Sequence, residues 1–149
     1  MGNPQISTLE VGGELKNATA VINWLDSELE RGGVSGETAS DILICVDEAF
    51  SNIIFHSNKH QSGGPSWTGG LVGMIRIRLS VNAHSVTIVF CDDAEALILP
   101  DVKPQLGQAV LERTTPGVGV YIMRQLMDEV SYQRDGNTNC LTLIKKLNS

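Results

Sequence analysis

The chain has 149 residues, of which 42% are hydrophobic and 19% are charged, and these values are typical of one globular domain spanning residues 1–149. Its formal net charge of −6 at pH 7 disfavours direct nucleic-acid binding and attachment to anionic membranes, because both need clustered Lys and Arg. No run approaches the roughly 20 apolar residues of a membrane span, and there is no N-terminal signal pattern, so we expect a cytoplasmic protein.

The first half of the chain predicts a strand and two helices. Apolar residues alternate with polar ones near the start, and further along they recur at the three- and four-residue spacings of amphipathic helices. The predicted elements are a strand at Gln5–Val11, a helix at Glu14–Arg31 that stops at Gly32 and Gly33, and a helix from a cap at Ser35 to about Asn58. Gln61–Gly73 is rich in glycine and is expected to form a loop.

The second half predicts two hairpins separated by an irregular segment and a helix. Met74–Val81 and Ser85–Cys91 alternate cleanly on either side of a short turn, which is typical of a β-hairpin. The remaining predictions are an irregular segment at Asp92–Pro116 with a short helix near Gln108–Arg113, a helix at Val118–Met127, and a hairpin of Ser131–Arg134 and Asn139–Lys146 turned at Asp135–Asn137.

The order of these elements predicts an α+β fold of two layers. The sequence β-α-α-β-β-α-β-β favours helices packed on one face of a mixed, largely antiparallel sheet. A doubly wound fold would alternate strands and helices instead. The chain also lacks the GxxxxGK[ST] phosphate loop, so a Walker-type ATPase is not expected.

Three cysteines, Cys45, Cys91 and Cys140, lie within or beside apolar runs. None forms a CxxC pair or a Cys/His spacing that would suggest a structural zinc site. We therefore expect reduced thiols that act as small core residues in a cytosolic protein.

Two polar residues share one flank of the second predicted helix. At about 100° per residue, this helix has an apolar core stripe formed by Ile42, Val46, Ala49 and Ile53. Asp41, Glu48 and Asn52 group beside the stripe, with Glu48 and Asn52 one turn apart. An amide oxygen can bind a hydrated Mg²⁺, and a carboxylate can take a proton from a hydroxyl. Taken alone, however, such residues are more often the solvated flank of an ordinary helix.

Two further segments could contact a nucleotide. Asp92 ends a strand on the same side as the apolar residues of that strand, so it is expected to face a pocket, whereas Asp93 would face outward. A carboxylate there could accept a hydrogen bond from the exocyclic amine of adenine. Gly117 and Gly119 stand at the start of a predicted helix, whose free amides could bind phosphate. Alone, each is better explained as a turn former or a flexible helix start.

The order of these segments and their amino-acid sequences resemble those of one known family. Val46–His56 (VDEAFSNIIFH) is similar to the N-box of the ATPases that include gyrase, heat-shock chaperones, mismatch-repair proteins and histidine kinases. Within that group it is most similar to the DEAxxNxxxH phrase of the anti-sigma factor serine kinases. Pro116–Val130 resembles their second glycine box, Asp92–Ala94 stands where they have an adenine-binding Asp-x-Gly, and Asn139–Leu147 fits their final strand. The resemblance covers nearly the whole chain from about Ala18.

The resemblance implies the histidine-kinase-like (gyrase-type, Bergerat) fold and a role for each matching residue. Glu48 would be the catalytic general base, Asn52 would bind Mg²⁺, and Asp92 would bind the adenine amine. The phosphates would be held by backbone amides under a mobile lid drawn from Ile98–Pro116. The remaining expected nucleotide contacts are Ala94, Thr115, Gly117, Val118, Gly119 and Val120.

The resemblance also implies an activity and partners. The protein would be an ATP-binding anti-sigma factor with serine protein kinase activity, using ATP and Mg²⁺. It would phosphorylate an anti-anti-sigma (STAS-type) partner and sequester a sigma factor, and it could form a homodimer. The catalytic domain of a histidine kinase is a less favoured alternative, because this chain has no room for a phosphoacceptor helix hairpin.

Two departures from the family pattern favour an alternative function. Ala94 replaces the glycine of the first box, where a methyl group would reduce affinity if the backbone must approach the ligand closely. Leu97 stands where the family usually has Phe. These residues leave open a protein-interaction switch of the same fold that binds ATP weakly or not at all.

Overall fold

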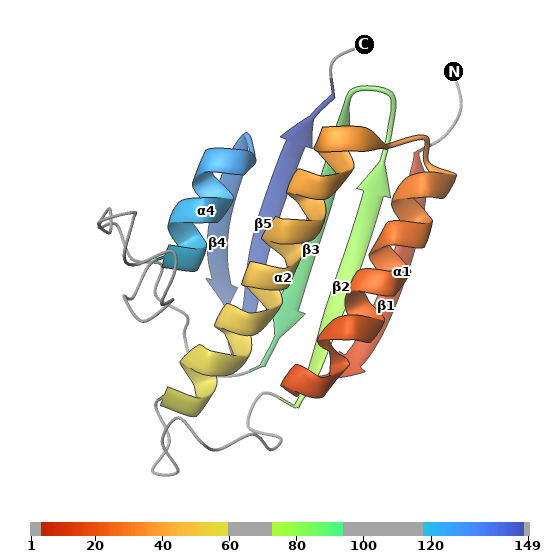
Figure 1. Ribbon diagram of the computed structural model, residues 1–149. Coiled ribbons are helices and arrows are strands. Elements are labelled where there is room, and N and C mark those ends of the chain that lie inside the picture. The colour runs from red at the N-terminus through yellow and green to blue at the C-terminus, as the bar shows by residue number, and fades with distance from the viewer. Residues whose placement is uncertain (1–3, 60–72, 94–117, 148–149) are drawn as a thin grey trace.

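The computed structural model describes residues 4–59, 73–93 and 118–147, and Figure 1 shows them as two layers, with the helices on one face of a sheet. The first part contains β1 (Gln5–Gly12), a 3₁₀ turn (Leu15–Asn17), α1 (Ala18–Arg31) and α2 (Gly36–Lys59). The second part contains β2 (Met74–Val81), β3 (Ser85–Asp92), α4 (Val118–Leu126), β4 (Glu129–Asp135) and β5 (Thr138–Lys146). The predicted order of elements is confirmed.

The sheet has the strand order β1-β2-β3-β5-β4, and each of its four ladders is antiparallel. The largely antiparallel sheet predicted from the sequence is therefore confirmed. The crossover that places β5 between β3 and β4 brings the end of β3 beside the start of β5, where Asp92 pairs with Asn139. This pairing positions the candidate site.

The hydrophobic core lies between the helices and the inner face of the sheet. The predicted apolar stripe of α2 is confirmed, because each of its four residues is at most 3% exposed. From the sheet, alternate residues of β2 and β3 point into the same layer, as their period-two burial shows. The buried residues that form this layer in the two strands are Ile75, Ile77, Leu79, Val81, Val86, Ile88 and Phe90.

Local chemistry explains where several elements begin and end. At Gly33 the backbone has φ +80°, and the amide of Val34 donates to Leu29 O at 2.9 Å, which closes the last turn of α1. Asn82 Oδ1 accepts from two backbone amides of the β2–β3 turn, at 2.7 and 2.9 Å. The β4–β5 hairpin turns at Gly136, whose φ of +62° favours glycine. The predicted turns are confirmed.

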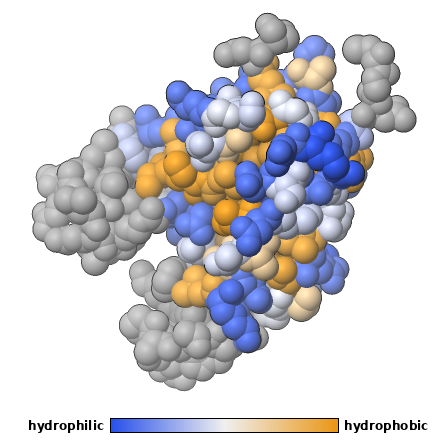
Figure 2. Space-filling view, turned by 45° about the vertical axis from the view of Figure 1, so that its right-hand side comes forward, coloured by the Kyte–Doolittle hydropathy of each residue, from blue (hydrophilic) through white to orange (hydrophobic). Residues whose placement is uncertain are grey.

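The outer face of the helix layer is mixed in character. Figure 2 shows hydrophobic side chains at the surface among strongly hydrophilic ones. A shallow groove of about 400 Å³ runs between α1 and α2, and Ile44 on its wall is 45% exposed. Asp47 lines the same groove, so a charged residue interrupts the apolar surface there.

The cysteine prediction is wrong for two of the three residues. Cys91 on β3 and Cys140 on β5 are direct cross-strand partners and form a disulfide. The two residues are 49 positions apart, so only the pairing of these strands brings the thiols together. Cys45 is buried on α2 and free, as predicted.

Candidate functional site

Glu48 and Asn52 lie on α2, one turn apart, on the side that faces α4. Glu48 is only 4% exposed although it carries a carboxylate, and Asn52 is half-buried. Buried carboxylates are uncommon unless a partner or a function retains them. The prediction that Glu48 and Asn52 share one flank of the helix is confirmed. The alternative, that they are ordinary solvated surface residues, does not fit the burial of Glu48.

Asp41, which the helix wheel groups with these two residues, belongs to a different contact. It lies 3.9 Å from Lys145 Nζ, and the same ammonium donates to Leu126 O at 2.6 Å. Lys145 thus ties the end of α4 to the first half of α2. Helix periodicity correctly places Asp41 and Glu48 on the same side of α2. Because they lie at different heights along the helix, Asp41 contacts β5 whereas Glu48 lies beside the start of α4.

Gly119 brings the start of α4 against the Glu48–Asn52 pair. A Cβ placed on Gly119 would lie 2.8 Å from Glu48 Oε2 and 2.8 Å from Asn52 Nδ2, closer than real Cβ contacts. Only a glycine therefore leaves room for both side chains in these positions. Two motifs separated by more than 60 residues therefore meet here.

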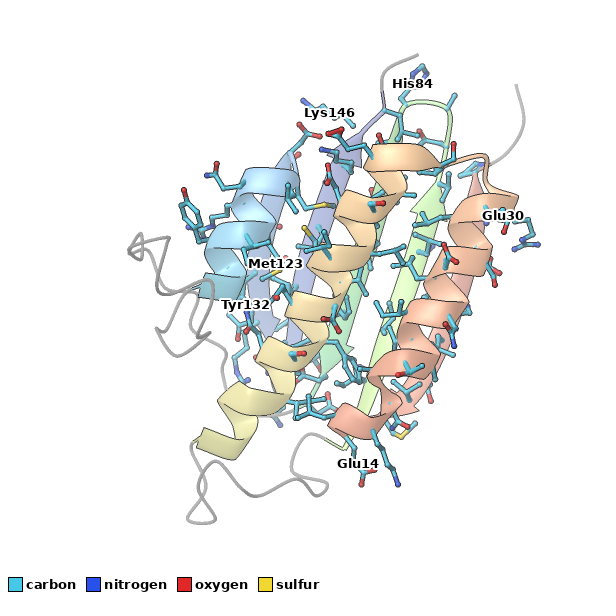
Figure 3. The ribbon with its side chains drawn as sticks, viewed as in Figure 1. Glu14, Glu30, His84, Met123, Tyr132 and Lys146 are labelled. Carbon is cyan, nitrogen blue, oxygen red and sulfur yellow. A yellow bond between two sulfur atoms is a disulfide. The ribbon has the colours of Figure 1, made fainter. Side chains whose placement is uncertain are left out.

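Apolar side chains hold α4 in this position. Val120 is 3% exposed and Met123 is fully buried. In Figure 3, Met123 points from α4 toward α2. The first turn of α4, which contains Val118, Gly119 and Val120, carries amides that have no partner within the helix, as at any helix start. Such amides bind phosphate oxygens well. Thr115 and Gly117 lie outside the described residues.

Asp92 faces inward at the end of β3 and is 3% exposed, as the strand alternation predicts. Its Oδ1 accepts a hydrogen bond from Asn139 Nδ2 at 3.0 Å. Asp93 faces outward, where it accepts from the Thr138 hydroxyl at 3.0 Å and lies 4.0 Å from Arg76. The structure therefore separates the two acids and leaves Asp92 as the carboxylate on the helix side. Ala94 lies outside the described residues.

Sequence reasoning missed three polar residues beside Asp92. Asn139 Oδ1 accepts from the Tyr132 hydroxyl at 2.5 Å and from Arg134 Nη1 at 2.7 Å. Tyr132 lies on the helix side of the sheet (Figure 3). The alternation of β5 could have identified Asn139. This residue has the same parity as Leu141 and Leu143, so its side chain faces inward with theirs.

These groups gather at one end of the molecule. Figure 1 shows the second half of α2, the end of β3, the start of β5 and the start of α4 at the same end. Across the described ranges, no group of three His, Cys, Asp or Glu side chains could hold a metal ion. The donors that are present, an amide oxygen and a carboxylate, fit a cation that keeps waters and phosphate oxygens as further ligands.

A cavity of about 860 Å³ lies at the opposite end, between the first turns of α2 and the end of β5. Its wall combines acids with Lys145 and Lys146. It contains none of the predicted site residues, so its size does not make it the candidate site. In the part of the chain that the structure describes, no helix is both long and apolar enough to span a membrane.

Comparison with known proteins identifies the family of the chain. The sequence profile of the histidine kinase-like ATPase domain matches residues 12–145, which is most of the chain and includes both site motifs. The chain belongs to the histidine kinase-like ATPase domain family. This membership confirms the predicted resemblance at the level of the fold family.

Curated relatives narrow the resemblance within the family. The chain is 28% identical over 137 residues to the serine/threonine-protein kinase BtrW of Bordetella bronchiseptica, covering 91% of this chain and 90% of BtrW. It is 29% identical over 121 residues to the serine-protein kinase RsbW of Bacillus licheniformis, covering 78% of this chain and 70% of RsbW. The relatives thus carry the serine kinase names that the motifs predict.

A solved structure supports the fold. The crystal structure of the SiaB–SiaC complex from Pseudomonas aeruginosa contains a chain that matches 93% of this one, with a TM-score of 0.55. The match covers 88% of that chain at 12% sequence identity. At this identity the likeness concerns the fold alone.

Proposed function

We propose that this protein is an ATP-dependent serine protein kinase and anti-sigma factor. It phosphorylates an anti-anti-sigma (STAS-type) partner and sequesters a sigma factor when that partner is unavailable. The observation that carries the proposal is the contact of Gly119 with Glu48 and Asn52, which joins a helix start suited to phosphate with a carboxylate and an amide. Family membership and the kinase names of the relatives support it.

The described residues offer contacts for each part of Mg-ATP. Asp92 would accept a hydrogen bond from the adenine amine, and the amides of Val118, Gly119 and Val120 would bind phosphate oxygens. Asn52 Oδ1 would be a ligand of Mg²⁺. When bound, the cation would neutralise charge on the phosphates. The close approach of the Gly119 backbone to Asn52 and Glu48 brings the start of α4 beside both side chains, which supports this arrangement.

Glu48 is the candidate for the proton acceptor in transfer. The serine oxygen of the partner would form a bond to the γ-phosphorus, and the bond from that phosphorus to the bridging oxygen of ADP would break. The hydroxyl proton would pass to the Glu48 carboxylate. A buried carboxylate is a suitable base because little water surrounds it to compete for the substrate hydroxyl. The remaining rate enhancement would come from positioning.

A phosphotransfer assay tests the enzyme proposal. Wild type, Glu48→Gln and Asp47→Asn are incubated with γ-labelled ATP, Mg²⁺ and serine-bearing STAS-domain proteins from the same genome. Asp47 is the matched control, because it precedes Glu48 but is exposed. We expect labelling by wild type and Asp47→Asn, and a loss on the order of 10²–10⁴-fold with Glu48→Gln. Wild type that binds Mg-ATP but labels none of these proteins would contradict the proposal.

The family resemblance adds four points to this proposal. They are the STAS-type partner, sequestration of a sigma factor, a homodimer and a cytoplasmic location. Co-purification of the protein with each sigma factor of the genome, with and without a STAS partner, tests sequestration. A sigma factor that binds should be released when the unphosphorylated partner is added. Sedimentation at several concentrations tests the dimer.

A second candidate function is a protein-interaction switch without kinase activity, which the Ala94 substitution favours. Calorimetric titration of wild type with Mg-ATP distinguishes the two. The switch predicts weak or no binding, and an Ala94→Gly variant should then gain affinity. Tight binding by wild type, lost in Asp92→Asn, would exclude the switch.

A further inference from the structure

Four polar side chains form a connected network at the end of the sheet. Asn139 on β5 is central: it donates to Asp92 Oδ1 at 3.0 Å and accepts from Tyr132 and Arg134 at 2.5 and 2.7 Å. Asp92 and Asn139 are 3% and 2% exposed. Burying such groups costs free energy unless hydrogen bonds replace those to water. The network therefore satisfies these groups in one particular arrangement.

The network fixes which way the Asn139 amide points. Arg134 has only donors, so the atom that it contacts must be the amide oxygen. The amide nitrogen consequently faces Asp92, to which it can only donate. The positive charge of Arg134 on the amide oxygen also polarises the amide and strengthens its donation to the carboxylate. The Asn139 amide thus holds the Asp92 carboxylate through Oδ1, and Tyr132 and Arg134 in turn hold the Asn139 amide.

A fixed carboxylate matters for the choice of base. Adenine presents an amine at position 6 and can donate to Asp92, whereas a purine with an oxo group there presents an acceptor, which a carboxylate repels. A carboxylate free to rotate would lose part of this distinction. A buried polar group held in place discriminates more strongly, because a ligand that cannot pair with it leaves it desolvated and unsatisfied.

We propose that Asn139 is a positioning residue that orients Asp92 for recognition of the 6-amino group of adenine, with Arg134 holding the Asn139 amide. This inference rests on the proposed function, since it assigns selectivity within the proposed ATP site. It predicts that Asn139 contributes to affinity through the amine of the base, and not through the sugar or the phosphates.

The test removes the amine from the ligand as well as the amide from the protein. Calorimetry measures the affinity of Mg-ATP and of the triphosphate of purine riboside, which lacks the 6-amino group. Wild type should prefer ATP by roughly 10- to 100-fold, the worth of a hydrogen bond to a charged group. In Asn139→Asp, which keeps an acceptor for Tyr132 and Arg134 but replaces the donor facing Asp92, the preference should fall below about threefold.

The ratio of the two affinities separates positioning from a structural role. A distorted fold weakens both ligands alike and leaves the ratio unchanged. Because Asn139→Asp also places a second carboxylate beside Asp92, where the two can share a proton, the Arg134→Gln variant separates positioning from a change of charge. Arg134→Gln, at an exposed position of an edge strand, is a milder second variant and should lower the ratio in the same direction. Thr138→Val is the matched control, because Thr138 bonds the outward-facing Asp93 and should not affect the ratio.

The outcomes are distinguishable. If wild type prefers ATP and both Asn139→Asp and Arg134→Gln keep the same preference, the positioning role is wrong while the ATP site stands. If wild type binds neither triphosphate, the proposed function fails and this inference fails with it. A ratio that falls in both network variants and not in Thr138→Val supports the inference.

Discussion

The backbone of Gly119 lies so close to the Glu48 carboxylate that a β-carbon on Gly119 would be 2.8 Å from Glu48 Oε2. This contact joins a helix near the middle of the chain with one near its end. It also makes the two parts of the candidate site dependent on each other, since the position of the carboxylate requires the absence of a side chain on α4.

Gly119→Ala should damage the site and not the fold. The added methyl group meets the ends of the Glu48 and Asn52 side chains, which can rotate away, and alanine favours a helix over glycine. The free energy of unfolding should change by less than about 1 kcal/mol, while phosphotransfer falls by about tenfold or more because both side chains are displaced. Thermal unfolding and the labelling assay measure the two effects. Gly12→Ala, where the nearest atom would be 3.4 Å away, is the control.

Asp92→Asn should raise the KM for ATP, and Asp93→Asn should not. Asp92 is the last residue of β3 and Asp93 follows it, but only Asp92 faces the helix side of the sheet. Replacing the carboxylate removes a hydrogen bond to a charged group, which corresponds to about a 10- to 100-fold loss of affinity. Steady-state kinetics over a range of ATP concentrations measures the effect. Equal KM values for the two variants would show that Asp92 does not contact the base.

Cys45 should make the protein less stable in alkali. Burial, with a smaller effect of the Asp41 charge, raises the pKa of the Cys45 thiol from its ordinary value of 9.0 to about 12. Above pH 9 the unfolded chain loses this proton first, so the stabilising contribution is complete below pH 9 and decreases as the pH rises toward 12. Denaturant unfolding of wild type and Cys45→Ala between pH 8 and 11 measures this loss, which should reach roughly 2–3 kcal/mol by pH 11. We expect a shallower decline for the variant; parallel declines would contradict the prediction.

Glu28 should contribute stability that is lost in acid. The Ser7 hydroxyl donates to its carboxylate, Arg31 Nη2 lies 2.7 Å from it, and both lower the pKa of Glu28 below 4.5. The contribution is therefore present above the unfolded pKa and decreases as the pH falls through the lower folded value. Glu28→Gln should lower stability by less than about 1 kcal/mol at pH 7 and by nothing at pH 2. Glu30→Gln, whose exposed side chain lies two residues further along α1 (Figure 3), is the control variant for the same measurement.

Most of the fold could be predicted from periodicity alone. Alternation in β2 and β3 and the apolar stripe of α2 report which face of each element is buried, because a sheet has a period of two and a helix a period of 3.6. The same rule correctly distinguishes Asp92 from Asp93. The predictions on Ala94, Thr115 and Gly117 lie outside the described residues and stay predictions.

What the sequence determined by itself was the set of elements, their buried faces and the family motifs, because these depend on neighbours within a few residues along the chain. Tertiary structure decided which distant groups meet. The placement of β5 beside β3 opposed Cys91 to Cys140, where the sequence predicts reduced thiols, and it opposed Asn139 to Asp92. The packing of α4 on α2 set Gly119 against Glu48. Strand register and helix packing depend on the combined burial of many side chains, and no single motif encodes that sum.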